Sequence, residues 1–165
     1  MNPHMGKVRR WHFVHKNAGN CSYESYLHKV AKIKIREVFL SSEHFLLSYN
    51  AKAICSLECP FIGFPKCEGE KPVEFDLRRY YDTCEIEATY HQYRADLLLT
   101  STTNPKTPPM LIEIMVTHKC TEDKIKDGVR IIEIPIQSEE QIDNIVSDCK
   151  LTAVRDEHYN YSYSN

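Results

Sequence analysis

Three strand-like runs decide the fold of this chain: Glu85-Ile-Glu-Ala-Thr-Tyr90, Tyr93-Arg-Ala-Asp-Leu-Leu-Leu99 and Leu111-Ile-Glu-Ile-Met-Val-Thr-His118. Each run carries an acidic residue between apolar neighbours, namely Glu87, Asp96 and Glu113. A carboxylate in such a run is costly to bury unless it is paired with a cation. Oxygen ligands suit Mg²⁺ or Mn²⁺, so the three acids predict a hard-metal site of the kind that cuts phosphodiesters. The alternative is an ion pair, for which Arg94 is close enough in sequence to serve Glu87 or Glu113.

Working outward from these runs, the sequence predicts an α/β fold around one mixed sheet. Helices are expected over 22–40, about 121–127 and from 138 to about 150, and further strands over 8–15, 45–49, 130–136 and 151–155. The order helix, three strands, helix, strand, helix is typical of an α/β sandwich. A single domain over 8–155 is therefore expected, followed by a disordered tail over 156–165.

The long helix over 22–40 carries two different stripes. Leu27 and Ala31 belong to an apolar face, whereas His28 and Lys32 recur four residues apart on another. If this helix packs across the sheet near Asp96, His28 or Lys32 can reach a metal-bound water or a phosphate. Both residues are therefore candidates for the site.

Composition limits the classes of function. The chain of 165 residues has no apolar run long enough to cross a membrane and no signal-peptide pattern at its N-terminus, so a soluble cytoplasmic protein is expected. Residues 1–66 carry 10 Lys and Arg against 4 Asp and Glu, while residues 67–165 carry 11 against 19. A basic half beside an acidic, strand-rich half suits a polyanion held over a metal site. Ordinary charged helix surfaces are the alternative explanation.

Seven cysteines without a secretory signal argue against a disulfide framework. Cys55, Cys59 and Cys67 lie in a cysteine-bearing segment over 50–72, whose part Cys59–Cys67 contains Pro and Gly and shows no clear helix or strand period. A tetrahedral zinc site would give this segment order, with Cys84 or Cys21 as the fourth ligand. The alternative is that these cysteines are reduced thiols that pack as small apolar side chains.

Several segments together resemble the restriction-endonuclease-like PD-(D/E)XK nuclease superfamily, and within it the competence protein CoiA-like nucleases. The segments are His12-Phe-Val-His15, Glu24-Ser-Tyr-Leu-His28-Lys-Val-Ala-Lys32, Phe75-Asp-Leu-Arg-Arg-Tyr-Tyr-Asp82, Tyr93-Arg-Ala-Asp96, Ile112-Glu-Ile-Met-Val-Thr-His118 and Ile131-Ile-Glu-Ile134. They cover most of residues 12–147. The resemblance implies a three-layer α/β/α-type core with a mixed central sheet, into which the cysteine-rich segment 50–72 is inserted.

The resemblance also implies residue roles. Asp96 and Glu113 match the two positions that hold Mg²⁺ or Mn²⁺ in such nucleases, and Glu87 is a candidate third acid. The lysine that usually follows the Glu by two residues is Met115 here. Met carries no charge and donates no useful hydrogen bond. The missing cation is therefore expected from His28 or Lys32 on the long helix, or from Lys124 on the helix over about 121–127.

The sequence thus predicts a metal-dependent nuclease that acts on DNA rather than RNA, in DNA uptake, recombination or repair. A homodimer is compatible with it. One alternative is an inactive nuclease fold that binds nucleic acid or protein and is stabilised by zinc; another is a zinc-stabilised interaction module that has no nucleic-acid role.

Overall fold

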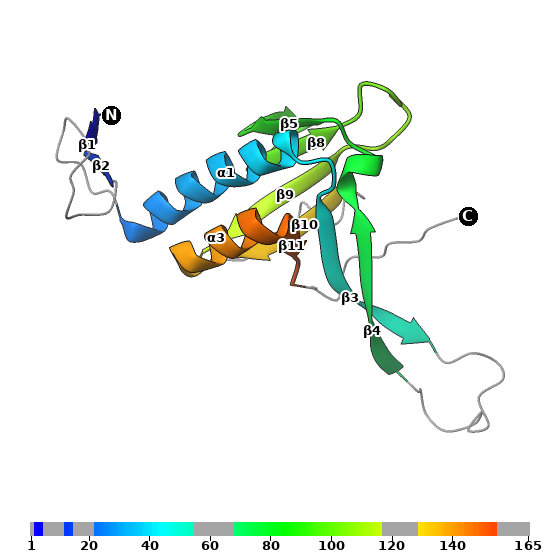
Figure 1. The fold of residues 1–165 in the computed structure, drawn as a ribbon. Helices are drawn as coiled ribbons and strands as arrows, with labels where there is room; N and C mark the ends of the chain where they lie inside the picture. Colours follow the sequence, from blue (N-terminus) through cyan, green and yellow to red (C-terminus); the bar gives the residue numbers. More distant parts are fainter. Residues whose placement is uncertain (1, 5–11, 15–21, 55–67, 117–128, 155–165) are drawn as a thin grey trace.

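The computed structural model describes residues 2–4, 12–14, 22–54, 68–116 and 129–154 (Figure 1). It is a mixed α/β protein whose main sheet has four strands in the order β10-β9-β8-β5. These strands are β5 (Thr83–Ile86), β8 (Leu97–Thr100), β9 (Met110–Met115) and β10 (Arg130–Pro135). Strand β8 runs antiparallel to β5 and to β9, and β10 is parallel to β9. The predicted α/β class is confirmed.

Helix α1 (Tyr23–Ser41) starts as the sequence predicts. The hydroxyl of Ser22 caps it by accepting a hydrogen bond from the Ser25 N–H at 3.2 Å, and Glu24 places a negative charge in the first turn. The apolar stripe packs on the sheet, because Leu27, Ala31, Ile35 and Phe39 are all buried at intervals of four residues.

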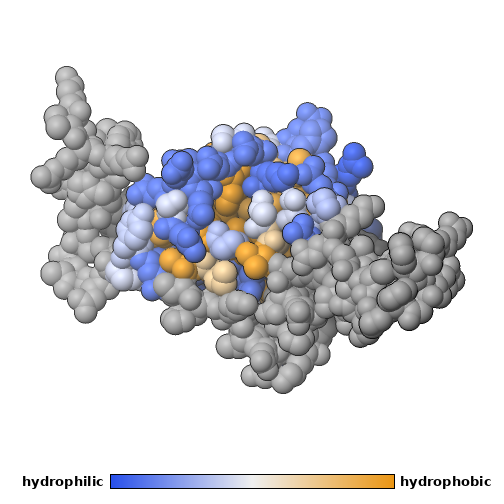
Figure 2. Space-filling view, turned by 90° about the horizontal axis from the view of Figure 1, so that it is seen from below, coloured by the Kyte–Doolittle hydropathy of each residue, from blue (hydrophilic) through white to orange (hydrophobic). Residues whose placement is uncertain are grey.

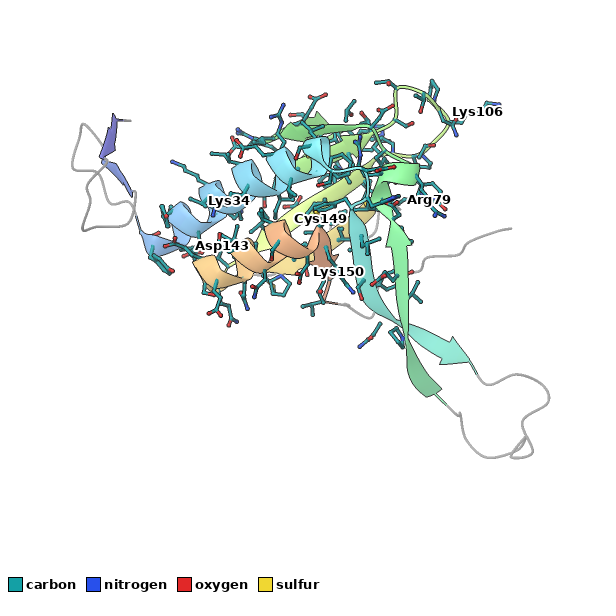
Figure 3. The ribbon with its side chains drawn as sticks, in the orientation of Figure 1. Lys34, Arg79, Lys106, Asp143, Cys149 and Lys150 are labelled. Carbon is teal, nitrogen blue, oxygen red and sulfur yellow. The ribbon has the colours of Figure 1, made fainter. Side chains whose placement is uncertain are left out.

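Helix α3 (Glu139–Asp148) lies beside α1 on the same face of the main sheet, as Figure 1 shows. Lys34 of α1 and Asp143 of α3 form an ion pair of 2.6 Å between the two helices (Figure 3). The helix that the sequence predicts over about 121–127 lies outside the described residues, as does the tail over 156–165. The described helices thus form one layer on the main sheet.

The expectation of one mixed sheet is wrong, because a second sheet has three strands in the order β11-β3-β4. Its strands are β3 (Leu46–Ile54), β4 (Glu68–Asp76) and β11 (Lys150–Thr152). The predicted strand near 151–155 is present as β11 but pairs with β3, and only an isolated bridge between Glu133 and Val154 connects it to the main sheet.

The segment over 50–72 contains the end of β3 and the start of β4, whereas its part over 59–67, for which no helix or strand period is expected, lies outside the described residues. Strands β3 and β4 pair from Leu46↔Asp76 to Ile54↔Glu68, and the hairpin projects away from the main sheet in Figure 1. Pro72 is tolerated because β4 is an edge strand, where a missing N–H interrupts no central ladder. The short 3₁₀ helix η1 (Leu77–Arg79) follows β4.

The remaining strands are short. Strands β1 (Asn2–His4) and β2 (His12–Val14) pair with each other, and the rest of the predicted strand over 8–15 lies outside the described residues. Strands β6 (Thr89–Tyr90) and β7 (Tyr93–Arg94) form a small hairpin between β5 and β8. The predicted strands 84–90 and 93–100 are therefore each broken in two, at Glu87 and at Asp96.

The main sheet is apolar on both faces. Leu97, Leu99 and Ile112 pack on the side of α1, while Leu98 and Leu111 pack on the other, as expected from strand alternation. Figure 2 shows hydrophilic residues around the described surface and hydrophobic ones near the middle of this view.

Among the described helices, none is long and apolar enough to cross a membrane.

Candidate functional site

A pocket of about 490 Å³ opens between the first turns of α1 and the start of β8. We call it the Lys32 pocket, and its charged lining residues are Glu24, His28, Lys29, Lys32, Glu87, Arg94 and Asp96. It brings together four of the five candidate catalytic residues predicted from the sequence. Because the four come from α1, from the turn after β5 and from the start of β8, the fold and not a local motif assembles the site.

Lys32 is the centre of this pocket. The residue is only 4 % exposed, and its Nζ donates a hydrogen bond of 2.7 Å to Glu87 Oε1 while lying 3.5 Å from Asp96 Oδ1. Burying an ammonium group is costly unless carboxylates compensate for the lost hydration. The neighbouring Ala31 lies in the apolar core, so α1 carries an apolar stripe and a charged stripe side by side, as the sequence predicts.

Asp96 sits where the chain bends between β7 and β8. One carboxylate oxygen, Oδ2, accepts a hydrogen bond from the Ile114 N–H at 2.9 Å and lies 2.9 Å from His28 Nε2. Burial raises the pKa of the Asp96 carboxyl, but the hydrogen bonds from His28 and Ile114 and the charges of His28 and Lys32 outweigh it and leave this pKa below its ordinary value. Asp96 is therefore ionised at neutral pH.

Glu87 does not lie in a strand, contrary to the sequence-based prediction. Its φ of 53° is in the left-handed region, where a residue other than Gly is uncommon and strained. Its carboxylate accepts hydrogen bonds from Lys32 and from Arg94, so the predicted ion pair between Arg94 and Glu87 is confirmed. The hydrogen bond from Lys32, followed by the charges of Lys32 and Arg94, lowers the pKa of Glu87.

Glu113, the fifth candidate, is not among the residues that line the Lys32 pocket. Register brings it close, because Leu97 pairs with Ile112 and the next pair along the two strands would be Asp96 and Glu113. However, the bend at Asp96 turns that carboxylate toward α1, whereas strand alternation places Glu113 on the opposite face, with Leu111. The predicted metal pair is thus adjacent in the sheet but divided between its faces.

Two neighbours of Glu113 also concern the predictions. Met115, at the position of the usual lysine, follows Glu113 on β9, and its carbonyl oxygen accepts a hydrogen bond from the Ile136 N–H. Glu133 of β10 lies beside Glu113 in parallel register and is buried. Between the isoleucines of its strand, Glu133 is expected either to face solvent or to pair with a Lys, and its burial excludes the first of these.

The predicted zinc site is described only at Cys84. Cys84 lies on β5 inside the core, where burial raises its thiol pKa to about 12. Because zinc binds the thiolate, this environment disfavours Cys84 as a ligand. Cys21, Cys55, Cys59 and Cys67 lie outside the described residues, so a zinc site that they form stays a prediction.

The donor chemistry of the Lys32 pocket suits a hard divalent cation. Asp96 and Glu87 each direct a carboxylate oxygen at the Lys32 ammonium group. The two carboxylates therefore share one positive charge at the position of Nζ. Mg²⁺ commonly uses one or two carboxylates and completes its coordination with water and substrate phosphate. The residues that the structure describes contain no group of three or more His, Cys, Asp or Glu side chains arranged around a common cation position. Asp96 and Glu87 both pair with side-chain cations of the protein itself.

Sequence reasoning missed two cations of the pocket. Lys29 lines it beside His28 on α1, and Arg94 reaches it from β7. Arg94 was expected only as an ion-pair partner, although its place two residues before Asp96 was a usable signal. Together with Lys32 and His28 they make the pocket a candidate binding site for an anion.

Comparisons with other proteins add no assignment. The chain matches no protein-family model, no curated protein and no solved structure.

Proposed function

We propose that this chain is a nuclease-like domain that hydrolyses phosphodiester bonds in DNA with the help of Mg²⁺ or Mn²⁺, and that the Lys32 pocket is its active site. The observation that carries the proposal is the buried ammonium group of Lys32, held between Asp96 and Glu87 on the wall of an open pocket. A buried lysine that lines a cavity can contact a ligand.

The arrangement of elements supports this proposal. Helix α1 precedes three antiparallel strands, β5, β8 and β9, and β10 then lies parallel to β9. This order agrees with the restriction-endonuclease-like core that the resemblance implies, in which two adjacent strands and the preceding helix supply the site. Asp96 lies at the first of the two expected ligand positions, at the start of β8.

In the proposed site, Lys32 takes the role of the lysine that Met115 replaces. Lys32, Lys29 and Arg94 bind the oxygens of the scissile phosphate and balance the charge that develops there. Asp96 holds Nε2 of His28. Proton exchange with a water or with the leaving oxygen therefore falls to Nδ1 of the same ring.

Asp96 would hold the divalent cation together with Glu87, because Glu113, the second ligand that the resemblance implies, lies on the other face of the sheet. When bound, such a cation neutralises phosphate charge and lowers the pKa of a bound water. The contribution of this chain is to fix Asp96 by the Ile114 N–H and by His28 before any ligand arrives.

The test is cleavage of end-labelled DNA in Mg²⁺ or Mn²⁺ by the full chain and by Lys32→Met. The substitution keeps most of the side-chain volume and removes the charge, so we expect a loss of roughly a hundredfold in rate. Lys34→Met is the matched control, since Lys34 lies on the same helix but pairs with Asp143. Equal rates for wild type and Lys32→Met, or no cleavage by the wild type, would contradict the proposal.

A second candidate function is a nucleic-acid-binding module without hydrolysis. It is favoured by the pairing of Asp96 and Glu87 with cations of the protein itself, and by Met115. This module would bind labelled DNA with an affinity that falls steeply as salt rises, because phosphate contacts release counterions. It would leave the DNA intact in the presence of either metal.

A further inference from the structure

A second pocket, of about 710 Å³, adjoins the small hairpin formed by β6 and β7. We call it the Tyr90 pocket. Its lining includes the side chains of Tyr90, His91, Gln92, Tyr93 and Arg130. The proposed hydrolytic site uses none of them.

The Tyr90 pocket offers flat rings and hydrogen-bond donors. The rings of Tyr90 and His91 meet edge to face with centroids 4.3 Å apart, and the buried Tyr93 has its hydroxyl fixed by Gln92 Nε2 at 2.8 Å. Arg130 supplies a planar cation that can stack or donate. Among the described residues that line this pocket there is no carboxylate. Such a surface suits a planar, hydrogen-bonding group attached to an anion.

The hairpin separates the two pockets by the thickness of one strand. Tyr93 and Arg94 are neighbours on β7, so their side chains leave the strand on opposite faces. Tyr93 accordingly lines the Tyr90 pocket, while Arg94 lines the Lys32 pocket and pairs with Glu87. A strand of DNA can reach both pockets only by passing around the hairpin, so a phosphate at Arg94 and a base at Tyr90 or His91 belong to different nucleotides of one strand.

We propose that the Tyr90 pocket binds an unpaired nucleobase of single-stranded DNA whose backbone crosses the Lys32 pocket. This inference rests on the proposed function, because the phosphate site defines where the strand lies. Aromatic rings accept any base by stacking, provided that the base is free of its partner strand. A fully paired duplex offers no such base, so the pocket selects for single-stranded or locally opened DNA.

The first experiment needs no variant. Fluorescence anisotropy without divalent ions compares binding of a short single strand, of the same strand with one abasic position scanned along it, and of the matching duplex. We expect the single strand to bind more tightly than the duplex and one abasic position to weaken binding by about tenfold. Equal affinity for all abasic positions and for the intact strand would overturn the inference.

The second experiment uses His91→Ala, which removes an exposed ring at the loop, and Tyr90→Leu, with Tyr80→Leu as the control. Tyr80 is an exposed tyrosine that contacts Phe75 at the end of η1, away from both pockets. We expect the two pocket variants to weaken binding of the single strand by about tenfold and the duplex much less, with Tyr80→Leu unchanged. Affinities for the single strand that match the control in both pocket variants would overturn the inference.

The two proposals can fail separately. Cleavage of DNA that depends on Lys32 but not on Tyr90 or His91 would overturn the base-binding role and leave the hydrolytic site standing. Base-dependent binding of single strands without any cleavage would overturn the hydrolytic site and leave the base-binding role standing.

Discussion

Asp96 and Asp76 are two carboxylates with similar surroundings and different consequences. Each has little exposed surface, each lies within 3 Å of a histidine ring nitrogen, and each accepts a hydrogen bond from at least one backbone N–H. The pKa of the Asp76 carboxyl is also below its ordinary value. Burial raises this pKa, but the hydrogen bonds from His44, Phe45 and Arg78 together lower it by more. Burial, the histidine contact and the direction of the pKa shift therefore do not distinguish Asp96 from Asp76.

What separates them is the group that completes each site. Asp76 uses Oδ1 for the N–H groups of Phe45 and Arg78, and so connects the start of β3 to η1. Asp96 accepts a hydrogen bond from one backbone N–H, and its carboxylate also contacts the side chains of Lys32 and His28 on the wall of an open pocket. A carboxylate surrounded by backbone donors stabilises the fold, whereas one that shares a cavity with side-chain cations can act on a ligand.

The largest effect is expected from Asp96→Asn on hydrolysis. The substitution keeps an oxygen for the Ile114 N–H and removes the charge that faces Lys32, so the rate should fall by roughly a hundredfold or more. Gel-based cleavage of labelled DNA measures it. If Asp76→Asn lowers the rate per folded molecule as much as Asp96→Asn does, the division between the two acids is wrong.

Asp76→Ala should be the most destabilising substitution at either acid. It leaves the N–H groups of Phe45 and Arg78 without their acceptor, at a cost of about 2–4 kcal/mol in the free energy of unfolding. Urea denaturation followed by circular dichroism gives this value. A larger loss for Asp96→Ala would indicate that Asp96 is the main structural carboxylate.

Acid pH should weaken the fold through both acids. Because their folded pKa values are lowered, each contributes stability that is present above the unfolded value of about 3.9 and is lost as pH falls through the folded value. Unfolding measured between about pH 5 and pH 2 should show the loss. Asp76→Asn should flatten this dependence, and an unchanged slope would contradict the role of Asp76.

The histidines should show the smallest effects on stability. His44 is 67 % exposed at its side chain, so His44→Gln should cost about 0.5–1 kcal/mol and leave hydrolysis unchanged. His28→Gln should change stability as little but slow hydrolysis, because His28 lines the pocket. Thermal unfolding and cleavage rates, measured on the same two preparations, distinguish these outcomes. Loss of hydrolysis in His44→Gln would contradict the comparison.

Local signals in the sequence predict the helices and most strands well. Ser22 and Glu24 mark the start of α1, and the stripe of His28 and Lys32 correctly indicates a charged face beside an apolar one. Similarly, Ser138 caps α3 as expected. These signals depend on neighbours within one or two turns, which the sequence displays directly.

The features that the sequence does not reveal depend on backbone geometry and on distant pairing. Nothing local indicates the left-handed φ of Glu87 or the bend at Asp96, and this bend is what divides Asp96 from Glu113. A shift of one residue reverses the face of a strand residue, so the assignment of a metal pair from alternation alone was vulnerable. The pairing of β11 with β3 is equally non-local.

The most direct test of the account is calorimetric titration of Mn²⁺ into the full chain, into Asp96→Asn and into Asp76→Asn, each first shown to be folded. The account predicts binding by the wild type and by Asp76→Asn, and a loss of binding in Asp96→Asn. Binding that survives in Asp96→Asn, or that disappears in Asp76→Asn alone, would contradict the claim that Asp96 and the Lys32 pocket form the active site.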